Sequence, residues 1–185
     1  MLNGSHPLLA SLSPALRSYV YEHLEPVRLD RRSIIYSRGD AITDVYFIQS
    51  GIAALAWPDR ARPADLALIG AEGVIGSELS LGLPTTTFQA LSRSEVLAFR
   101  VRKPAFAHLC EQSPGFQASM HRFSAELTAQ IAETAFVNAR LSVEQRVARW
   151  IELASRLLKT DTFALTHDDL ARAIGCRRAG VTCPL

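Results

Sequence analysis

The chain has 185 residues, enough for one large domain or for a medium domain and a small one. Hydrophobic residues make up 48% and charged residues 21%, as in soluble globular proteins, and no apolar run approaches the roughly 18–20 residues of a membrane span. The cysteines (Cys110, Cys176 and Cys183) are odd in number, which argues against a disulfide framework. With no secretory signal visible at the N-terminus, we expect a cytoplasmic protein with reduced thiols and no membrane partner.

Positive charge gathers toward the C-terminal end of the chain. Residues 140–185 carry eight Arg and Lys and five acids, a net charge of +3, whereas residues 1–139 carry 12 bases and 13 acids, a net charge of −1. A basic segment on a near-neutral body favours a polyanionic partner. A solvated helix face would have much the same composition, so the charge alone leaves both interpretations open.

The first hundred residues suggest a short helix followed by many short strands. Ser13 before Pro14 is a typical helix start, and apolar residues then recur at helical spacing, which predicts a helix over residues 14–23. From Val27 onward, β-favouring runs alternate with Gly, Pro and Asp turns. The expected strands are 27–29, 33–36, 44–49, 52–57, 64–69, 86–90 and 95–101. Strands this short need a closed or double-sheet core, so a sandwich, jelly roll or barrel is expected.

A short helix over 105–111 is followed by a long one, predicted from Ser113 to Leu141. No Gly or Pro interrupts residues 116–141, and the apolar positions alternate between spacings of four and three, as in a two-helix seam. The expected dimer interface is Phe116, Met120, Phe123, Leu127, Thr134 and Val137, with Gln130 and Leu141 in the same register. An amphipathic helix packed on its own domain would show a similar pattern, so the alternative stays open.

Two more helices are predicted after this one. A capping box at Ser142 opens a helix that runs to about residue 158, and a second capping-box pattern begins at Thr166. Gly175 permits the positive-φ turn of a helix-turn-helix. An ordinary pair of helices would also fit this segment. Between the two helices, residues 163–165 are expected to be extended.

Three motifs in the β region complete the pattern: SIIYSRGD at 33–40, VYFIQSG at 45–51 and GVIG at 73–76. With the long helix and the helix-turn-helix in that order, the chain resembles the Crp–Fnr family of bacterial transcription regulators. The resemblance implies an α+β fold: an N-terminal double-stranded β-helix (jelly roll) of the cyclic-nucleotide-binding type with flanking short helices, a dimerisation helix and a winged helix-turn-helix. We expect a sensor domain over 1–112, the dimerisation helix over 113–141 and the helix-turn-helix over 142–185.

The resemblance also places an effector pocket. Cyclic-nucleotide binders of the family present Gly-Glu-Leu and a later Arg: backbone N–H groups and the Arg hold the cyclic phosphate, and the Glu binds the ribose hydroxyl. Here Glu78 is one residue out of step and Thr85 or Thr86 stands at the Arg position. The corresponding pocket residues are Gly76, Ser77, Glu78, Leu79, Thr85 and Thr86. Losing a charge-assisted bond of roughly 1.5–3 kcal/mol weakens binding about 10- to 100-fold, so cyclic AMP is a disfavoured ligand. We expect no cofactor or metal, because no Cys precedes Cys110 and the histidines lack ligand spacing.

The C-terminal residues are the expected DNA contacts. Arg177 and Arg178 match the start of the family's recognition helix, which contacts phosphates and base edges, and Thr182 lies one turn later. Thr166 is a fourth DNA-binding candidate. In the family, this helix continues for about two more turns and a wing follows, whereas the sequence ends at Leu185. The helix-turn-helix is therefore expected to be incomplete, and the sequence leaves open whether that end is natural.

The resemblance implies a regulatory protein, a dimer in which an effector repositions the helix-turn-helix heads. The expected partner of the intact protein is DNA, and RNA polymerase is a candidate further partner. The alternative is a sensor or dimerisation module without DNA-binding output. No enzyme is expected: the jelly roll of a cupin would need clustered ligands, and residues 27–101 contain no His.

Overall fold

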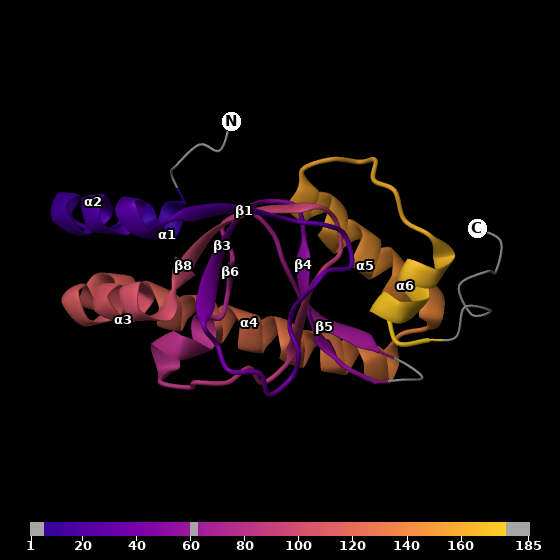
Figure 1. Cartoon of the computed structure of the whole chain (residues 1–185). Helices are drawn as coiled ribbons and strands as arrows, with labels where there is room; N and C mark the ends of the chain where they lie inside the picture. Colours follow the sequence, from indigo (N-terminus) through magenta and orange to yellow (C-terminus); the bar gives the residue numbers. More distant parts are fainter. Residues whose placement is uncertain (1–5, 60–62, 177–185) are drawn as a thin grey trace.

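The computed structural model describes residues 6–59 and 63–176, which form a two-sheet jelly roll with helices at one end and along one side (Figure 1). Both sheets are antiparallel and four-stranded, in the orders β1-β8-β3-β6 and β2-β7-β4-β5. The strands are β1 Glu25–Leu29, β2 Ile34–Tyr36, β3 Asp44–Ser50, β4 Ala53–Trp57, β5 Ala64–Ile69, β6 Val74–Ile75, β7 Gln89–Ser92 and β8 Val96–Arg102. The helices are α1 Pro7–Ala10, α2 Pro14–His23, the 3₁₀ helix η1 Ser77–Leu81, α3 Lys103–Gln112, α4 Pro114–Arg140, α5 Val143–Leu158 and α6 His167–Ala173.

Side chains alternate between the two faces of each strand, so each sheet contributes to the hydrophobic cores on its faces. On β3, Val45 and Phe47 are fully buried and pack with Phe106 of α3 and Phe116 of α4 in the core between the first sheet and the helices. Other strand residues face the opposite sheet, where Ile48 lies in the core that the two sheets enclose. The apolar faces of both sheets are thereby covered, as a double-sheet fold requires.

One predicted strand differs from the structure. The strand expected over 86–90 begins three residues later, at Gln89, because Thr86 bonds across a turn: its amide donates to Asp40 O at 2.9 Å and its hydroxyl to Ser37 O at 2.8 Å. The extended segment expected over 163–165 pairs with no strand. The predicted set also lacked β6 and η1, which are too short to show a period.

The helix starts agree closely with prediction. Ser13 accepts from Leu16 N, and Ser142 caps α5 in a full capping box. Thr166 caps α6 in the same way, and Gly175 has φ +67° as the turn predicted. The long helix is present as α4, and Ser113 accepts from Phe116 N at 3.3 Å at its start.

The face of α4 assigned to dimerisation is corrected by the structure. Phe116, Met120 and Val137 are buried in this chain's own core, and Phe123 packs against the same clusters. At the seam position of Gln130, the side-chain oxygen accepts a hydrogen bond from Leu68 N of β5 at 3.1 Å. Leu127 packs on the core between the sheets, and Thr134 is partly buried. The three-four pattern therefore describes a helix packed on its own sensor domain.

Candidate functional site: an effector pocket under the long helix

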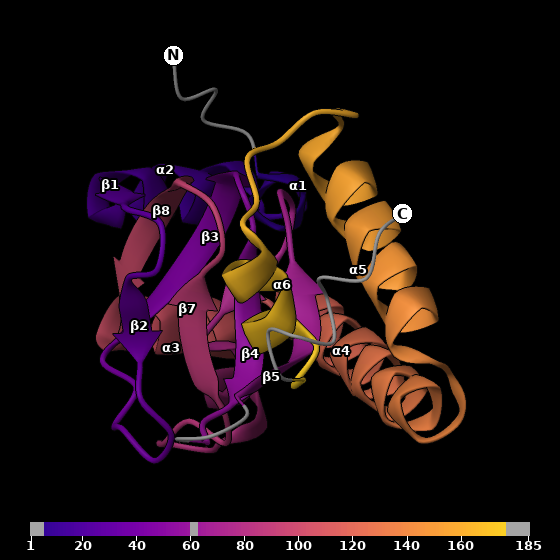
Figure 2. The same ribbon diagram turned by 90° about the vertical axis from the view of Figure 1, so that its right-hand side faces the viewer.

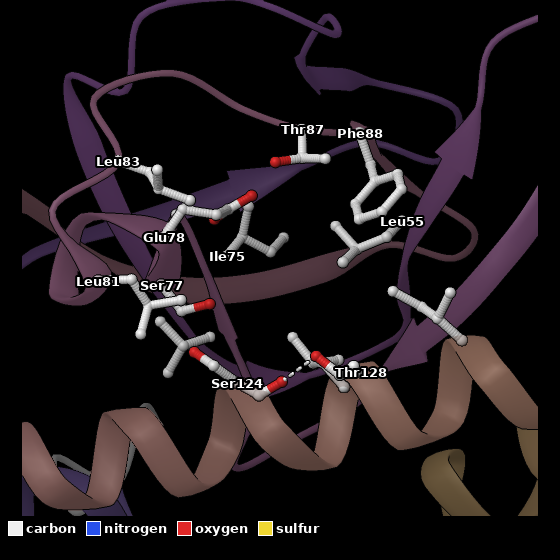
Figure 3. Close-up of a pocket in the computed structure, with 14 residues that line it drawn as sticks. Leu55, Ile75, Ser77, Glu78, Leu81, Leu83, Thr87, Phe88, Ser124 and Thr128 are labelled. Carbon is white, nitrogen blue, oxygen red and sulfur yellow. Dashed lines mark hydrogen bonds between the residues drawn. The ribbon is translucent and has the colours of Figure 1, made fainter.

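A cavity of about 150 Å³ lies between η1, the second sheet and α4 (Figure 3). Its walls are mostly apolar, and α4 supplies four of its lining residues. It is lined by Leu55, Val74, Ile75, Gly76, Ser77, Glu78, Leu81, Leu83, Thr87, Phe88, Ser124, Leu127, Thr128 and Ile131. Leu81 and Leu83 are about half exposed, at 49% and 46%, so they mark the side where the cavity meets solvent. A ligand in this cavity would touch both the β domain and the helix that leads to the C-terminal segment.

Glu78 is the ionisable side chain in the lining. Burial raises the pKa of its carboxyl group, and hydrogen bonds from its own backbone and from the backbone of Thr87 oppose that rise. An incoming anion would meet this carboxylate on the wall of the cavity.

Half of the residues that were predicted to form the pocket line the cavity in the structure. Gly76, Ser77 and Glu78 line the cavity, but Leu79 packs into the cores on either side of the first sheet. Thr85 and Thr86 do not line it, because Thr85 bridges to Ala41 and the Thr86 hydroxyl is used by the Ser37 carbonyl. Thr87 is the threonine in the lining.

The part of the cavity wall that α4 forms was not predicted from the sequence. Ser124, Leu127, Thr128 and Ile131 share one helix face through spacings of three and four, which was the available signal. Leu127 was assigned instead to a dimer seam. Only the packing of α4 across the second sheet places this face on the cavity (Figure 3).

Comparisons with known proteins agree with this arrangement of strands around a pocket. Residues 26–113 match the cyclic nucleotide-binding domain family. Solved structures extend the similarity over nearly the whole chain. A protein ascribed to the crp/fnr family of transcriptional regulators from Eubacterium rectale has a TM-score of 0.77 and 16% identity, over 95% of this chain and 83% of that one. The c-di-GMP responsive global regulator CLP of Xanthomonas campestris has a TM-score of 0.72 and 17% identity, over 91% of this chain and 88% of that one. FixK2 of Bradyrhizobium japonicum has a TM-score of 0.71 and 14% identity, over 86% of this chain and 81% of that one. At these identities the similarity shows the fold. Comparison with curated proteins gives no match.

The β domain also contacts the helices that follow α4. Figure 2 shows α6 lying in front of β4 and β5, with α5 alongside. A third core joins the second sheet to both helices; its members include Ile52, Ala54, Leu68, Trp150, Ala154, Leu170, Ala173 and Ile174. A salt bridge of 3.1 Å between Arg149 and Glu133 links α5 back to α4. The last two helices are therefore docked on the β domain.

A buried polar cluster lies at this contact. Asp65 of β5 is 6% exposed and accepts from Arg93 Nε at 2.9 and 3.1 Å, with a further bond from Arg93 Nη2. Trp150 Nε1 of α5 donates to the same carboxylate at 3.2 Å. Burial raises the pKa of Asp65, while Arg93 and Trp150 act in the opposite direction. The indole bond gives α5 a specific position on the sheet.

A second polar cluster holds α6. Asp169 is 5% exposed, and its carboxylate accepts from Arg31 Nη2 at 2.7 Å and from Arg32 Nη2 at 2.7 Å, both on the β1–β2 turn. The same carboxylate completes the cap with Thr166. Burial opposes ionisation, but hydrogen bonds from Thr166 and Arg32 outweigh it and lower the pKa of Asp169 to about 2. We call Asp169, Arg31 and Arg32 the latch.

The predicted DNA contacts fall partly outside this structure. Thr166 caps α6, and its hydroxyl donates to Asp169 Oδ2 at 2.5 Å, so that hydroxyl is engaged within the helix cap. Arg177, Arg178 and Thr182 lie outside the described residues. No group of three or more His, Cys, Asp or Glu side chains that could hold a metal occurs in residues 6–59 and 63–176. In that part of the chain, no helix has the length and apolar character of a membrane span.

Proposed function

We propose that this protein is a dimeric, non-enzymatic transcription regulator of the Crp–Fnr type, whose sensor pocket controls the position of DNA-binding heads. The observation that carries the proposal is the shared wall of the pocket. The cavity is lined from α4 by Ser124, Leu127, Thr128 and Ile131, and α4 is followed two residues later by α5 and then by α6. The match to the cyclic nucleotide-binding domain and the crp/fnr-like fold of nearly the whole chain support this assignment.

The DNA-binding head would begin at α6. Thr166 caps this short helix, and the left-handed Gly175 turns the chain toward Arg177 and Arg178, the order of elements in a helix-turn-helix. We propose that Arg177, Arg178 and Thr182 contact DNA, while Thr166 acts through the cap. RNA polymerase would be a further partner of a regulator of this type.

We place the dimer interface on the face of α4 that points away from the β domain. This face is exposed along its length and is formed by small side chains with one large apolar residue, Phe136, which is 64% exposed. Its residues are Ala118, Ala125, Ala129, Ala132 and Phe136. Successive members from Ala125 lie four, three and four apart, which is the seam spacing of a two-helix contact, and small side chains let two helices approach closely.

The dimer is tested by sedimentation of Ala129→Glu beside Ala135→Glu. Both positions are exposed alanines of α4, but residue 135 lies about a quarter turn off the proposed face. We expect Ala129→Glu to give monomers and Ala135→Glu to leave the dimer in place. Equal behaviour of the two variants would refute the interface.

DNA binding is tested by fluorescence anisotropy of the protein on DNA fragments taken from upstream of its own gene. We expect binding that weakens steeply with salt and is lost in Arg178→Ala. A stable dimer without affinity for any fragment would refute the DNA-binding function and favour a sensor or dimerisation module.

A further inference from the structure

The pocket differs chemically from a site for an anionic nucleotide. Among the described residues that line it there is no Lys, Arg or His, and Glu78 supplies the one charge. Phosphate sites in proteins combine a cation with several backbone donors. This cavity has a carboxylate in place of the cation. An anionic ligand would therefore be repelled where a phosphate site would attract it.

The hydroxyl groups of the α4 wall also present acceptors. Ser124 Oγ donates to the Met120 carbonyl at 3.0 Å, and Thr128 Oγ1 donates to the Ser124 carbonyl at 2.9 Å (Figure 3). Each hydroxyl has one proton, which is already used within the helix, so what remains are oxygen lone pairs. Together with the Glu78 carboxylate, these groups give the cavity three acceptor side chains and no cation among its described lining residues, while the hydroxyls of Ser77 and Thr87 can donate or accept.

The volume of the cavity limits the size of the ligand. It is about 150 Å³, smaller than the roughly 300–1,000 Å³ typical of sites for drug-sized ligands. In other proteins an apolar cavity of about 150 Å³ holds benzene. The apolar walls include Leu55, Ile75, Phe88 and Ile131. A compact apolar body would fit between them, with one polar group directed at Glu78.

We propose that the pocket binds a small apolar molecule, about the size of a singly substituted benzene, that is uncharged or cationic and carries an N–H or O–H donor for Glu78. The inference rests on the proposed function in treating this cavity as the effector pocket. It follows from a lining that, in the described part of the chain, contains one carboxylate and no cation, and it predicts that cyclic nucleotides bind weakly.

Three probes of nearly equal size separate the charge types: benzylamine (cationic at pH 7), benzyl alcohol (neutral, with a donor) and benzoate (anionic). Isothermal titration of each into this chain, with cyclic AMP as a fourth ligand, needs no DNA. We expect benzylamine and benzyl alcohol to bind with dissociation constants on the order of 1 mM, and benzoate and cyclic AMP at least about 10-fold more weakly.

Two variants connect the preference to the cavity. Glu78→Gln removes the charge and should bring benzylamine and benzoate to within about threefold of each other. Ser124→Leu fills the cavity from α4 and should abolish binding of benzylamine and benzyl alcohol. Ser119→Leu is the matched control, because Ser119 makes the same type of bond, to Gly115 O at 2.9 Å, but does not line the cavity. Circular dichroism checks that each variant is folded.

The proposal is overturned if benzoate or cyclic AMP binds as tightly as benzylamine, if neither benzylamine nor benzyl alcohol binds, or if Ser124→Leu leaves their binding unchanged. None of these results bears on DNA binding, which is measured separately by fluorescence anisotropy. If the predicted ligands fail to bind but the protein binds DNA, the proposed function stands. Ligand binding without DNA binding points to the sensor module.

Discussion

Replacing both Arg31 and Arg32 with glutamine should loosen α6 from the β domain while leaving its cap in place. The two guanidinium groups bond the Asp169 carboxylate at 2.7 Å from the β1–β2 turn, whereas the cap is made by Thr166. Without them, a carboxylate that is only 5% exposed keeps the cap bonds but loses its cationic partners. A buried charge without a partner is costly, so states in which α6 has left the sheet become more populated.

The magnitude follows from the pKa of Asp169. The ordinary value is 3.8 and the folded value is about 2, a difference that corresponds to about 2.4 kcal/mol of preference for the ionised form. Thr166, which the variant keeps, supplies part of this preference, so the loss is expected to be smaller than about 2.4 kcal/mol. We therefore expect opening of α6 to become easier by about 2 kcal/mol, or about 30-fold in its equilibrium constant.

Hydrogen exchange at the amides of Leu170 and Ile174 measures this opening. Both amides are bonded within the α6 region, to Thr166 O at 3.1 Å and to Leu170 O at 2.9 Å. Arg28→Gln is the matched control, because Arg28 forms a salt bridge of 2.5 Å with Glu95 on the same domain, but both side chains are more than half exposed. Exposed pairs contribute little, so exchange in the control should change less than about threefold.

Equal exchange in the double variant and the Arg28→Gln control would refute the reasoning. It would mean that the apolar contact of Leu170 and Ile174 with the second sheet holds α6 without help from the latch. The pH dependence gives an independent check. Because the folded pKa of Asp169 is lowered, its stabilisation is present above pH 3.8 and is lost as the pH falls from 3.8 toward 2.

Three further predictions concern stability, each measured by urea unfolding. Trp150→Phe should cost about 1–2 kcal/mol, because buried Asp65 loses the indole donor; an unchanged midpoint would show that Arg93 satisfies this carboxylate alone. Burial lowers the pKa of His6 from 6.5 to about 4, so its neutral form is favoured in the folded state; stability should fall by about 2 kcal/mol between pH 7.5 and 5, and His6→Gln should flatten that slope. Gly39 and Gly51 have nearly the same positive φ, +88° and +87°. A Cβ added at Gly39 would have no atom within 4 Å, whereas a Cβ added at Gly51 would lie 2.0 Å from Glu95 O. Gly39→Ala should therefore cost about 1–2 kcal/mol and Gly51→Ala more than about 3 kcal/mol, and equal costs would contradict the steric argument.

Local signals in the sequence were sufficient for most elements. The caps at Ser13, Ser142 and Thr166 depend on side chains that bond amides three residues away, so they can be identified without a tertiary structure. The long helix also followed from local composition, because no Gly or Pro interrupts it. Strand β6 and helix η1 were missed, since two and five residues give no usable period.

The candidate pocket could be predicted only in part. Glu78 was identified from its place after Gly76, but the sequence offered three neighbouring threonines, and only the turn that bonds Thr86 to Ser37 and Asp40 leaves Thr87 in the lining. The α4 wall could not be assigned, because a three-four repeat is the same whether a helix packs on its own domain or on a partner.

The sequence by itself determined the order of elements, the helix starts and the presence of a strand-rich domain before a long helix, because these depend on neighbours along the chain. The tertiary structure decided which face of α4 is buried, that its Gln130 bonds β5, and that Arg31 and Arg32 meet Asp169 across 137 or more residues. Contacts of this range depend on how the two sheets and the last helices pack together. No local pattern specifies that packing, and the pocket and the latch both arise from it.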